Sequence, residues 1–319
     1  MSLVSLGEQI TIYGGCILIV FGVLGEIFNV IVLLSLKTFR QCPSGFYLTL
    51  MSFVNIGQLL FGLLSRVIIF GFEVDWNATS IVFCKFRLAF FLLCALVSYT
   101  CLCLAIIDQY LATSTRPHWQ QWCNNKIAYR LVLLFTFIWI GHLIPYPIML
   151  QHVISSTTNK VTCTSTNPSM VIYRSYYIGL FLTGYLPDII TLVFGILAYR
   201  NIRQIGYRTI PLVRRELDKQ LTVMVFAQVI INFLTNVPFS TLFAITFVTA
   251  NWKDTFALTV IQFTYNVSII IFYTYFSSSF YIYMCVSERF RRQFIHVIYQ
   301  IYSQRWRQKL KPNNQIAPY

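Results

Sequence analysis

The sequence predicts an all-α membrane protein, a seven-transmembrane helix bundle with a short amphipathic cytoplasmic helix. Seven apolar stretches each reach the roughly 20 residues that a helix needs to cross the hydrocarbon core of a bilayer. Most Lys and Arg residues fall on one side of these stretches. The stretches are also apolar at consecutive positions, as in 17–24 and 269–272, whereas the strands of a membrane β-barrel alternate apolar and polar side chains. Helices satisfy their own backbone hydrogen bonds, so they are the expected spanning elements.

The seven stretches follow one another through short connections. They lie at about residues 10–36, 46–70, 84–111, 127–150, 173–200, 220–249 and 255–285. These connections leave no room for a separate soluble domain of ordinary size. We therefore expect one seven-transmembrane domain over residues 1–287, followed by an amphipathic helix and cytoplasmic tail over residues 288–319.

The amphipathic helix is predicted over residues 288–305. Phe290, Phe294 and Val297 recur on one of its faces, and Arg292 lies off that face. This pattern is typical of a helix that lies on a membrane surface and contacts its lipids.

The positive charges orient the bundle. Of the 24 Lys and Arg residues, 18 lie in the 36–45 turn, the 112–130 loop, the 200–219 loop and the tail after Ser287. The opposite loops carry only Lys160, Arg174 and Lys253. Positively charged segments stay in the cytoplasm, so we expect an extracellular N-terminus and a cytoplasmic C-terminus. The net charge of +14 then indicates contact with anionic lipid headgroups rather than with nucleic acid.

Two of the nine cysteines, Cys84 and Cys163, face the oxidising exterior on this topology. They suggest one disulfide, and the alternative is two free thiols. Such a bridge would hold the 151–172 loop over the outer mouth of the bundle. Asn77-Ala78-Thr79, in the outward loop before Cys84, is a glycosylation acceptor sequence. Asn77 is therefore expected to carry a glycan.

Polar residues interrupt the apolar stretches at a few positions. They are Glu26, Arg66, Arg87, Asp108 and Asp188, with Asn29, Asn55, Asn232 and Asn236 as uncharged companions. Ionisable groups inside a membrane are costly and tend to mark function. Asparagine side chains, however, often only join helices by hydrogen bonds, and that alternative stays open. Glu26 and Asp188 are expected to be hydrogen-bonded within the bundle rather than to move protons or ions.

The spacing within the third stretch is informative. Cys84 and Gln109 are 25 residues apart, which corresponds to about 37 Å of helix and is enough to cross the membrane. Asp108-Gln109-Tyr110 therefore lies at the cytoplasmic end of a helix whose outer end carries Cys84. This arrangement resembles the rhodopsin-like (class A) G-protein-coupled receptors, in which a disulfide cysteine and an Asp/Glu-Arg-Tyr motif have the same spacing.

Further residues match landmarks of that family in the same order. They are Asn29, Asn55 (where the family usually has aspartate), Trp76, Trp139, Pro187, Pro238, and Ser279 with Tyr283 in place of Asn-Pro-x-x-Tyr. The resemblance covers residues 10–305, and the chain is most similar to invertebrate FMRFamide-like peptide receptors. It implies a helix-packing network of Asn29, Asn55, Ser98, Trp139, Pro187, Pro238 and Ser279. The two prolines each remove a backbone donor and provide a hinge.

The activation motif departs from the family. Gln109 replaces the arginine that would bind Asp108 in the resting state. Asp218, 20 residues before Pro238, stands where some members place an acid that locks this arginine. Here the lock would be a Gln109–Asp218 hydrogen bond, weaker than an ion pair, and raised basal activity is expected. The residues expected to serve activation and G-protein coupling are Asp108, Gln109, Tyr110, Asp218 and Tyr283.

A second departure concerns the sodium site of the family. Asn55, Tyr275 and Ser279 replace residues of that site, and no other acid is predicted nearby. A monovalent cation inside a bundle needs a carboxylate, so the site is expected to be lost.

The ligand site is expected at the outer mouth. Arg66 and Arg87 would meet a carboxylate or an amide carbonyl of a peptide, and Glu73 and Asp75 would meet a cationic side chain, such as the arginine of an Arg-Phe-amide peptide. Phe91 stands where amine receptors place an aspartate, so an amine ligand has no counter-ion. The alternative for the two arginines is that they reach toward the lipid headgroups.

The resemblance implies a plasma-membrane receptor that passes the binding of an extracellular peptide or other small ligand to a heterotrimeric G protein. The sequence contains no Gly-rich phosphate loop and no spaced His/Cys cluster, so we expect no enzyme activity, cofactor or metal. Two alternatives stay open. Gln109 and Asn236, the latter in place of an aromatic residue, favour a non-signalling or atypical seven-helix receptor. A small-solute transporter is less favoured, because inverted repeats and broken helices are not visible.

Overall fold

The computed structural model of this chain describes residues 3–35, 37–72, 74–114, 116–154, 161–205, 212–249, 252 and 254–309. Within these residues, seven helical segments are long and apolar enough to cross a membrane: Ser5–Ser35, Pro43–Phe72, Ile81–Thr113, Asn125–Met149, Pro168–Arg203, Gln220–Val248 and Thr255–Ser277. They coincide with the seven predicted stretches, so the predicted fold class is confirmed.

Three of the spans are built from more than one helical element. The second consists of α3 (Pro43–Gln58), the π-helix η1 (Leu59–Leu63) and α4 (Leu64–Phe72), the fourth of α8 (Asn125–Leu143) and α9 (Pro145–Met149), and the fifth of α10 (Pro168–Ile172), the π-helix η2 (Tyr173–Tyr185) and α11 (Leu186–Ile205). The other four spans are α1 (Leu3–Ser35), α6 (Ile81–Thr113), α12 (Leu212–Val248) and α13 (Thr255–Ser277).

Shorter elements lie in the connections and after the last span. They are α2 (Lys37–Arg40), α5 (Trp76–Thr79), α7 (Pro117–Gln120), the strands β1 (Gln151–Ile154) and β2 (Val161–Thr164), and the helices α14 (Ser279–Val286) and α15 (Glu288–Lys309). The two strands form an antiparallel pair in which His152 lies opposite Cys163.

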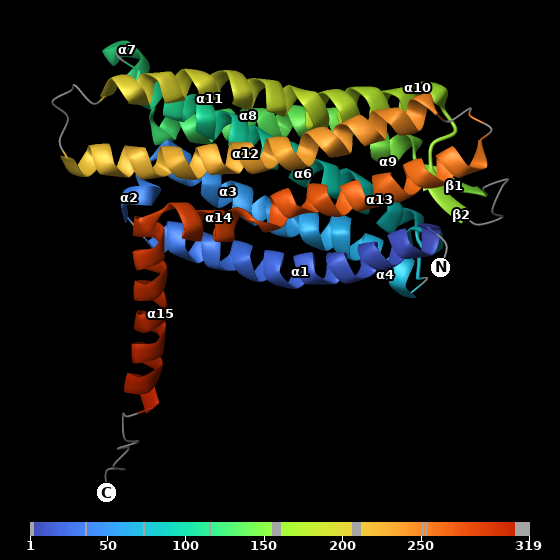
Figure 1. Ribbon diagram of the computed structural model, residues 1–319, viewed down its shortest axis with the longest axis horizontal. Helices are drawn as coiled ribbons and strands as arrows, with labels where there is room; N and C mark the ends of the chain where they lie inside the picture. The colour runs from blue at the N-terminus through green and yellow to red at the C-terminus, as the bar shows by residue number, and fades with distance from the viewer. Residues whose placement is uncertain are drawn as a thin grey trace, which may run out of the picture.

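The spanning helices run side by side, and the short elements gather at the two ends of the bundle (Figure 1). We call one end the disulfide end, because it carries β1, β2 and the N-terminus. We call the other the α15 end, because α14 and α15 lie there together with α2 and α7. Helix α6 is the central helix of the bundle. In its most apolar segment 61% of the residues are buried, the highest share of any span among the described residues. It packs against α3, α8, α11 and α12.

A disulfide joins α6 to the strand pair at the disulfide end. Ser80 precedes α6 and its hydroxyl accepts a hydrogen bond from the Phe83 amide at 3.3 Å, which is an N-cap. This start places Cys84 in the first turn, fully buried. The disulfide between Cys84 and Cys163 spans Cα atoms 6.2 Å apart, so the predicted bridge is confirmed.

Helix α15 leaves the bundle across the direction of the spans (Figure 1). Phe290 is fully buried, and its ring lies 6.0 Å from that of Phe280 and 5.7 Å from that of Tyr283. Arg291 donates to the carbonyls of Met284 and Cys285 at 3.0 and 2.9 Å, which satisfies free acceptors at the end of α14. Phe290, the first residue of the predicted apolar face, therefore packs α15 against the bundle.

The disulfide should contribute strongly to stability, because it closes a sequence separation of 79 residues. We expect Cys163→Ser to lower the free energy of unfolding by on the order of 2–5 kcal/mol, measured as a lower midpoint of thermal denaturation of the purified protein in detergent. Cys285→Ser, which changes an exposed free cysteine, is the control. Equal midpoints for the two variants would contradict this expectation.

Candidate functional site

A cavity of about 440 Å³ lies inside the bundle, in the half nearer the disulfide end, between α4, α6, η2, α12 and α13. It extends from the exposed side chains of Phe70 and Arg174 to the buried Gln58 and Ala95. Its volume falls within the range of small-molecule sites. The cavity is therefore reachable from the disulfide end and deep enough to hold a ligand between the helices.

The structure brings three of the predicted ligand residues to this cavity. Arg66, Arg87 and Phe91 line it. Asp75 does not line it; its carboxylate caps α5 and accepts from the Asn77 backbone and side-chain amides at 2.9 and 2.8 Å. Glu73 lies outside the described residues. Among the described residues, the predicted site thus contains its two arginines and Phe91 but not Asp75.

The two predicted arginines point into the bundle. Arg66 donates to the Asn266 side chain at 2.9 Å, and its guanidinium carbon lies 4.9 Å from the centre of the Phe70 ring. Arg87 donates to the Phe61 carbonyl at 2.9 Å and to the Asn77 side chain at 3.3 Å. Contacts between neighbouring helices hold both groups, which argues against the alternative that they only reach toward the headgroups.

Sequence reasoning missed other residues of the cavity. Arg174 lines it, as do Tyr146, Tyr265 and Tyr273. The sequence could have indicated Arg174, since it is one of the few positive charges outside the basic loops. It could not have indicated the tyrosines, because the spans contain many aromatic side chains and the sequence does not show which ones face inward.

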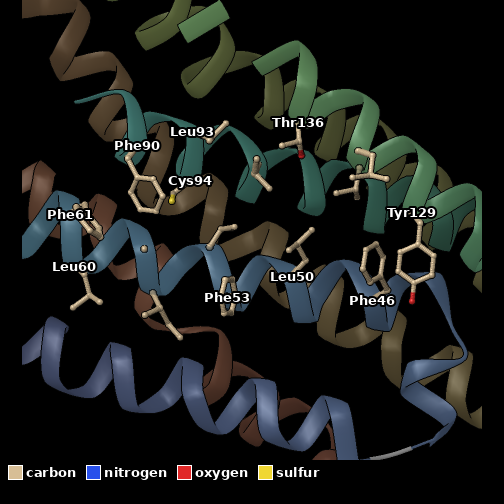
Figure 2. Close-up of a pocket in the computed structure, with 16 residues that line it drawn as sticks. Phe46, Leu50, Phe53, Leu60, Phe61, Phe90, Leu93, Cys94, Tyr129 and Thr136 are labelled. Atoms are coloured by element: carbon tan, nitrogen blue, oxygen red, sulfur yellow. The ribbon is translucent and has the colours of Figure 1, made fainter. Parts of the chain in front are cut away.

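A larger cavity of about 670 Å³ lies between α3, α6 and α8 (Figure 2). Phe53 and Leu133 on its border are 68% and 58% exposed, so it opens on the outer surface of the bundle, where lipid chains lie in a membrane. At one end the rings of Phe46 and Tyr129 meet edge to face at 4.3 Å. None of the described residues that line it is charged. We interpret it as a lipid-facing groove and place the candidate ligand site in the smaller, polar cavity.

In the middle of the bundle, α12 is joined to α11 through Asp188. Its two carboxylate oxygens accept from Asn232 at 2.6 Å and from Asn236 at 3.0 Å. Asn236 also donates to the carbonyl oxygens of Thr183 and Gly184 at 3.2 and 2.9 Å. Pro187 offers no backbone N–H, so the Thr183 carbonyl lacks its helical donor. The expectation that Asp188 is hydrogen-bonded within the bundle is confirmed, and Asn236 satisfies the carbonyl that the proline leaves free.

Closer to the α15 end, short polar contacts join the helices. Asn29 donates to Ser52 at 2.6 Å, which links α1 to α3. Ser98 donates to Asn55 at 2.7 Å and lies 3.5 Å from the Tyr275 hydroxyl, which links α6 to α3 and α13. Trp139, by contrast, donates to Thr100 at 2.9 Å on another face of α6. Trp139 therefore lies apart from the contacts that Asn29, Asn55 and Ser98 make.

Glu26 is fully buried beside these contacts. Its carboxyl group faces Ser52, Ser279, Asn55 and Asn29, but no group among the described residues has hydrogen-bonding geometry to either of its oxygens. Glu26 therefore lies within the bundle among four polar side chains, as expected, but without close hydrogen-bonding geometry. The expectation that no acid lies near Asn55 and Ser279 is wrong, because the Glu26 carboxyl group faces both.

At the α15 end, Gln109 connects three helices. Its amide nitrogen donates to the Ser44 hydroxyl of α3 at 2.6 Å, and its carbonyl oxygen accepts from the Thr222 hydroxyl of α12 at 2.5 Å. Ser44 in turn donates to the carboxylate of Asp108. The side chain of Asp218 lies outside the described residues, and Thr222 is one turn further along the same helix. The observed partner of Gln109 on α12 is thus a hydroxyl group.

The other predicted activation residues surround this contact. The Tyr110 ring packs against Trp119 at 5.5 Å and Phe194 at 5.6 Å, and its carbonyl accepts from Asn201 at 3.4 Å. Tyr283 is fully buried, and its hydroxyl has no hydrogen-bond partner among the described residues. Asp108, Gln109 and Tyr283 are buried and Tyr110 is half-buried, so the α15 end is closed over these four predicted coupling residues.

Comparison with known families supports this arrangement. A sequence model described as 7 transmembrane receptor (rhodopsin family) matches residues 27–280, more than half of the chain. No curated protein matches the chain.

The two buried acids should respond oppositely to replacement by the corresponding amide. We expect Glu26→Gln to leave the thermal midpoint unchanged or raise it, because it removes an acid whose burial is costly and keeps a polar group among the polar side chains that surround it. Asp188→Asn should lower the free energy of unfolding by about 1–3 kcal/mol, because an amide at this position places a donor against the donors of Asn232 or Asn236. Thermal denaturation in detergent measures both variants, and the opposite order of midpoints would contradict this reading.

Proposed function

The chain belongs to the rhodopsin family of seven-transmembrane receptors, and we propose that it passes the binding of an extracellular ligand, such as a neuropeptide, to a heterotrimeric G protein. Members of this family are signalling receptors of the plasma membrane and not enzymes. In the proposed orientation, the disulfide end and the N-terminus face the exterior, and the α15 end faces the cytoplasm. The concentration of Lys and Arg in the segments at the α15 end supports this orientation.

The observation that carries this proposal is that one helix, α12, both lines the cavity and binds Gln109 at the opposite end of the bundle. Phe239 and Phe243 of α12 line the cavity, and Thr222 of the same helix holds Gln109 at the α15 end. Thr222 and Phe239 are separated by about 25 Å of helix. A ligand that displaces the cavity end of α12 therefore acts directly on the element that closes the opposite end.

The contacts of α12 define the resting state. The α12 contact at the α15 end is a hydrogen bond between neutral groups, which is weaker than a charge-assisted one. Asp188 forms the firmer attachment in the middle of the helix, where Pro238 provides a hinge. Agonist binding would favour a state in which the α15 end of α12 moves outward and exposes Gln109 and Tyr283 to the G protein.

A second candidate is a seven-helix receptor that binds ligand without coupling to a G protein. The observation in its favour is that Gln109 is uncharged and only 3% exposed, so it offers no cation to a partner even after opening. A nucleotide-exchange assay separates the two candidates. Thr222→Val should open the α15 end. If this variant fails to stimulate nucleotide exchange on any G protein, the non-coupling receptor is favoured.

The Thr222 contact predicts basal activity. We expect Thr222→Val to raise basal nucleotide exchange about fivefold or more, because it leaves the buried carbonyl oxygen of Gln109 without its donor, at a cost of about 1 kcal/mol or more to the closed state. Thr222→Ser keeps the hydroxyl and should behave like the wild type. Equal basal exchange in the valine and serine variants would show that this contact does not hold the closed state.

The proposed orientation can be tested through Asn77. We expect glycosidase treatment to shift the wild-type protein on a gel and to leave Asn77→Gln unchanged. The control is Asn266→Gln, which removes a second acceptor sequence that lies inside α13. In the structure, Asn77 is 7% exposed and its amide nitrogen donates to Asp75, so a glycan on this nitrogen requires the side chain to turn toward solvent. Antibody accessibility of terminal tags in intact cells provides an independent readout, and tags on the same side would refute the topology.

A further inference from the structure

The cavity at the disulfide end has an unbalanced charge. Arg66, Arg87 and Arg174 line it, and none of the described residues that line it is an aspartate or a glutamate. The one ion pair found among the described residues, Arg292 with Glu288, lies on α15 at the other end of the molecule. Three arginines thus line one cavity in which the described residues place no carboxylate.

The present partners of these arginines are neutral. Arg66 is bound by the Asn266 amide oxygen, while its buried Nε has no partner among the described residues. Arg87 is bound by a backbone carbonyl and by the amide oxygen of Asn77. The Asp75 carboxylate interacts with Arg87 through its charge, but its hydrogen bonds go to Asn77 and it does not line the cavity. Arg66 and Arg87 thus donate to neutral oxygen atoms, and among the described residues no carboxylate lies between them in the cavity.

This arrangement is costly without a ligand. A charged group removed from water needs an opposite charge or a full set of hydrogen bonds. Guanidinium groups bind carboxylates in a planar, two-point geometry that uses the N–H donors still free here. The remainder of the wall is aromatic, with Phe91, Phe239 and Phe272 among its residues. The cavity therefore fits a molecule with an anionic head and an apolar or aromatic body.

We infer that the natural ligand carries a free carboxylate attached to an apolar group, and that Arg66, Arg87 and Arg174 bind this carboxylate. This inference rests on the proposed function, because it takes the cavity as the ligand site. The inference distinguishes peptides with an amidated C-terminus from peptides with a free one. An amidated peptide end has no charge to offer the three arginines, whereas a peptide with a free C-terminus, or a small carboxylic acid, does.

Matched pairs of probes that differ only in charge test the inference on the purified wild-type protein in detergent. The pairs are N-acetyl-L-phenylalanine with its primary amide, which imitate a peptide end, and 4-phenylbutyrate with 4-phenylbutanamide, which imitate a small acid. We expect a saturable rise of the thermal midpoint with millimolar acid and none with the amides. A response to one acid alone identifies the source of the carboxylate. Amides that act as well as the acids, or no response to either acid, would overturn the inference.

Variants locate the binding site. Arg66→Gln and Arg87→Gln should each bind the acid probes at least about tenfold more weakly. Arg174→Gln should weaken binding in the same direction without disturbing packing, because Arg174 is exposed. Arg130→Gln removes an equal charge from an exposed position on α8 and should bind like the wild type. Unchanged acid binding in all three cavity variants would also overturn the inference.

The binding measurement contains no G protein, so it separates two kinds of failure. If the acids bind as expected but no variant signals, the proposed coupling is wrong and the anionic ligand class stands. If Thr222→Val signals but the acids do not bind, the receptor function stands and the ligand class is wrong.

Discussion

The bilayer core offers no water, so a polar side chain on these helices needs a partner on its own helix or on a neighbouring one. The structure meets this constraint most fully at Asp188. Its two oxygens take amides from Asn232 and Asn236, and the second amide also satisfies the backbone carbonyl that Pro187 leaves without a donor. One asparagine thus compensates for both a buried acid and a helix-interrupting proline. The position of α12 against α11, and with it the shape of the cavity and the closure of the α15 end, depends on this contact.

Several buried groups among the described residues depart from this constraint, and two of these places differ in kind. Glu26 is fully buried within the closed core, where hydroxyl and amide groups surround its carboxyl group, so its burial is an unfavourable term that these groups offset only in part. The arginines of the cavity are also incompletely paired, but they border a space that a ligand can enter. An unpaired group that faces such a space indicates binding, whereas an unpaired group inside packed helices indicates local instability.

At the α15 end, Gln109 joins three helices through hydrogen bonds between neutral groups. It uses both ends of its amide, toward Ser44 and toward Thr222, and among the described residues no ion pair crosses between α3, α6 and α12. Since neutral hydrogen bonds are weaker than charge-assisted ones, the closed and open states of this receptor should be closer in free energy than an ionic lock would allow. The hydrogen bonds of Asp188 with Asn232 and Asn236 then contribute more to holding α12 against α11.

The sequence by itself determined the number of spans, the helix ends near Cys84 and Gln109, and the disulfide, because hydrophobic length, charge distribution and the redox compartment act through local composition. It also predicted Arg66 and Arg87 as ligand residues, and the structure places both at the cavity. It did not determine which polar groups meet. Glu26 was separated from Asn55 in the sequence but lies beside it in the bundle, Thr222 carried no signal that it would bind Gln109, and Asp75 was expected in the ligand site but instead caps a short helix. Such pairings depend on the rotation and packing of helices far apart in the chain, and only the tertiary structure sets these.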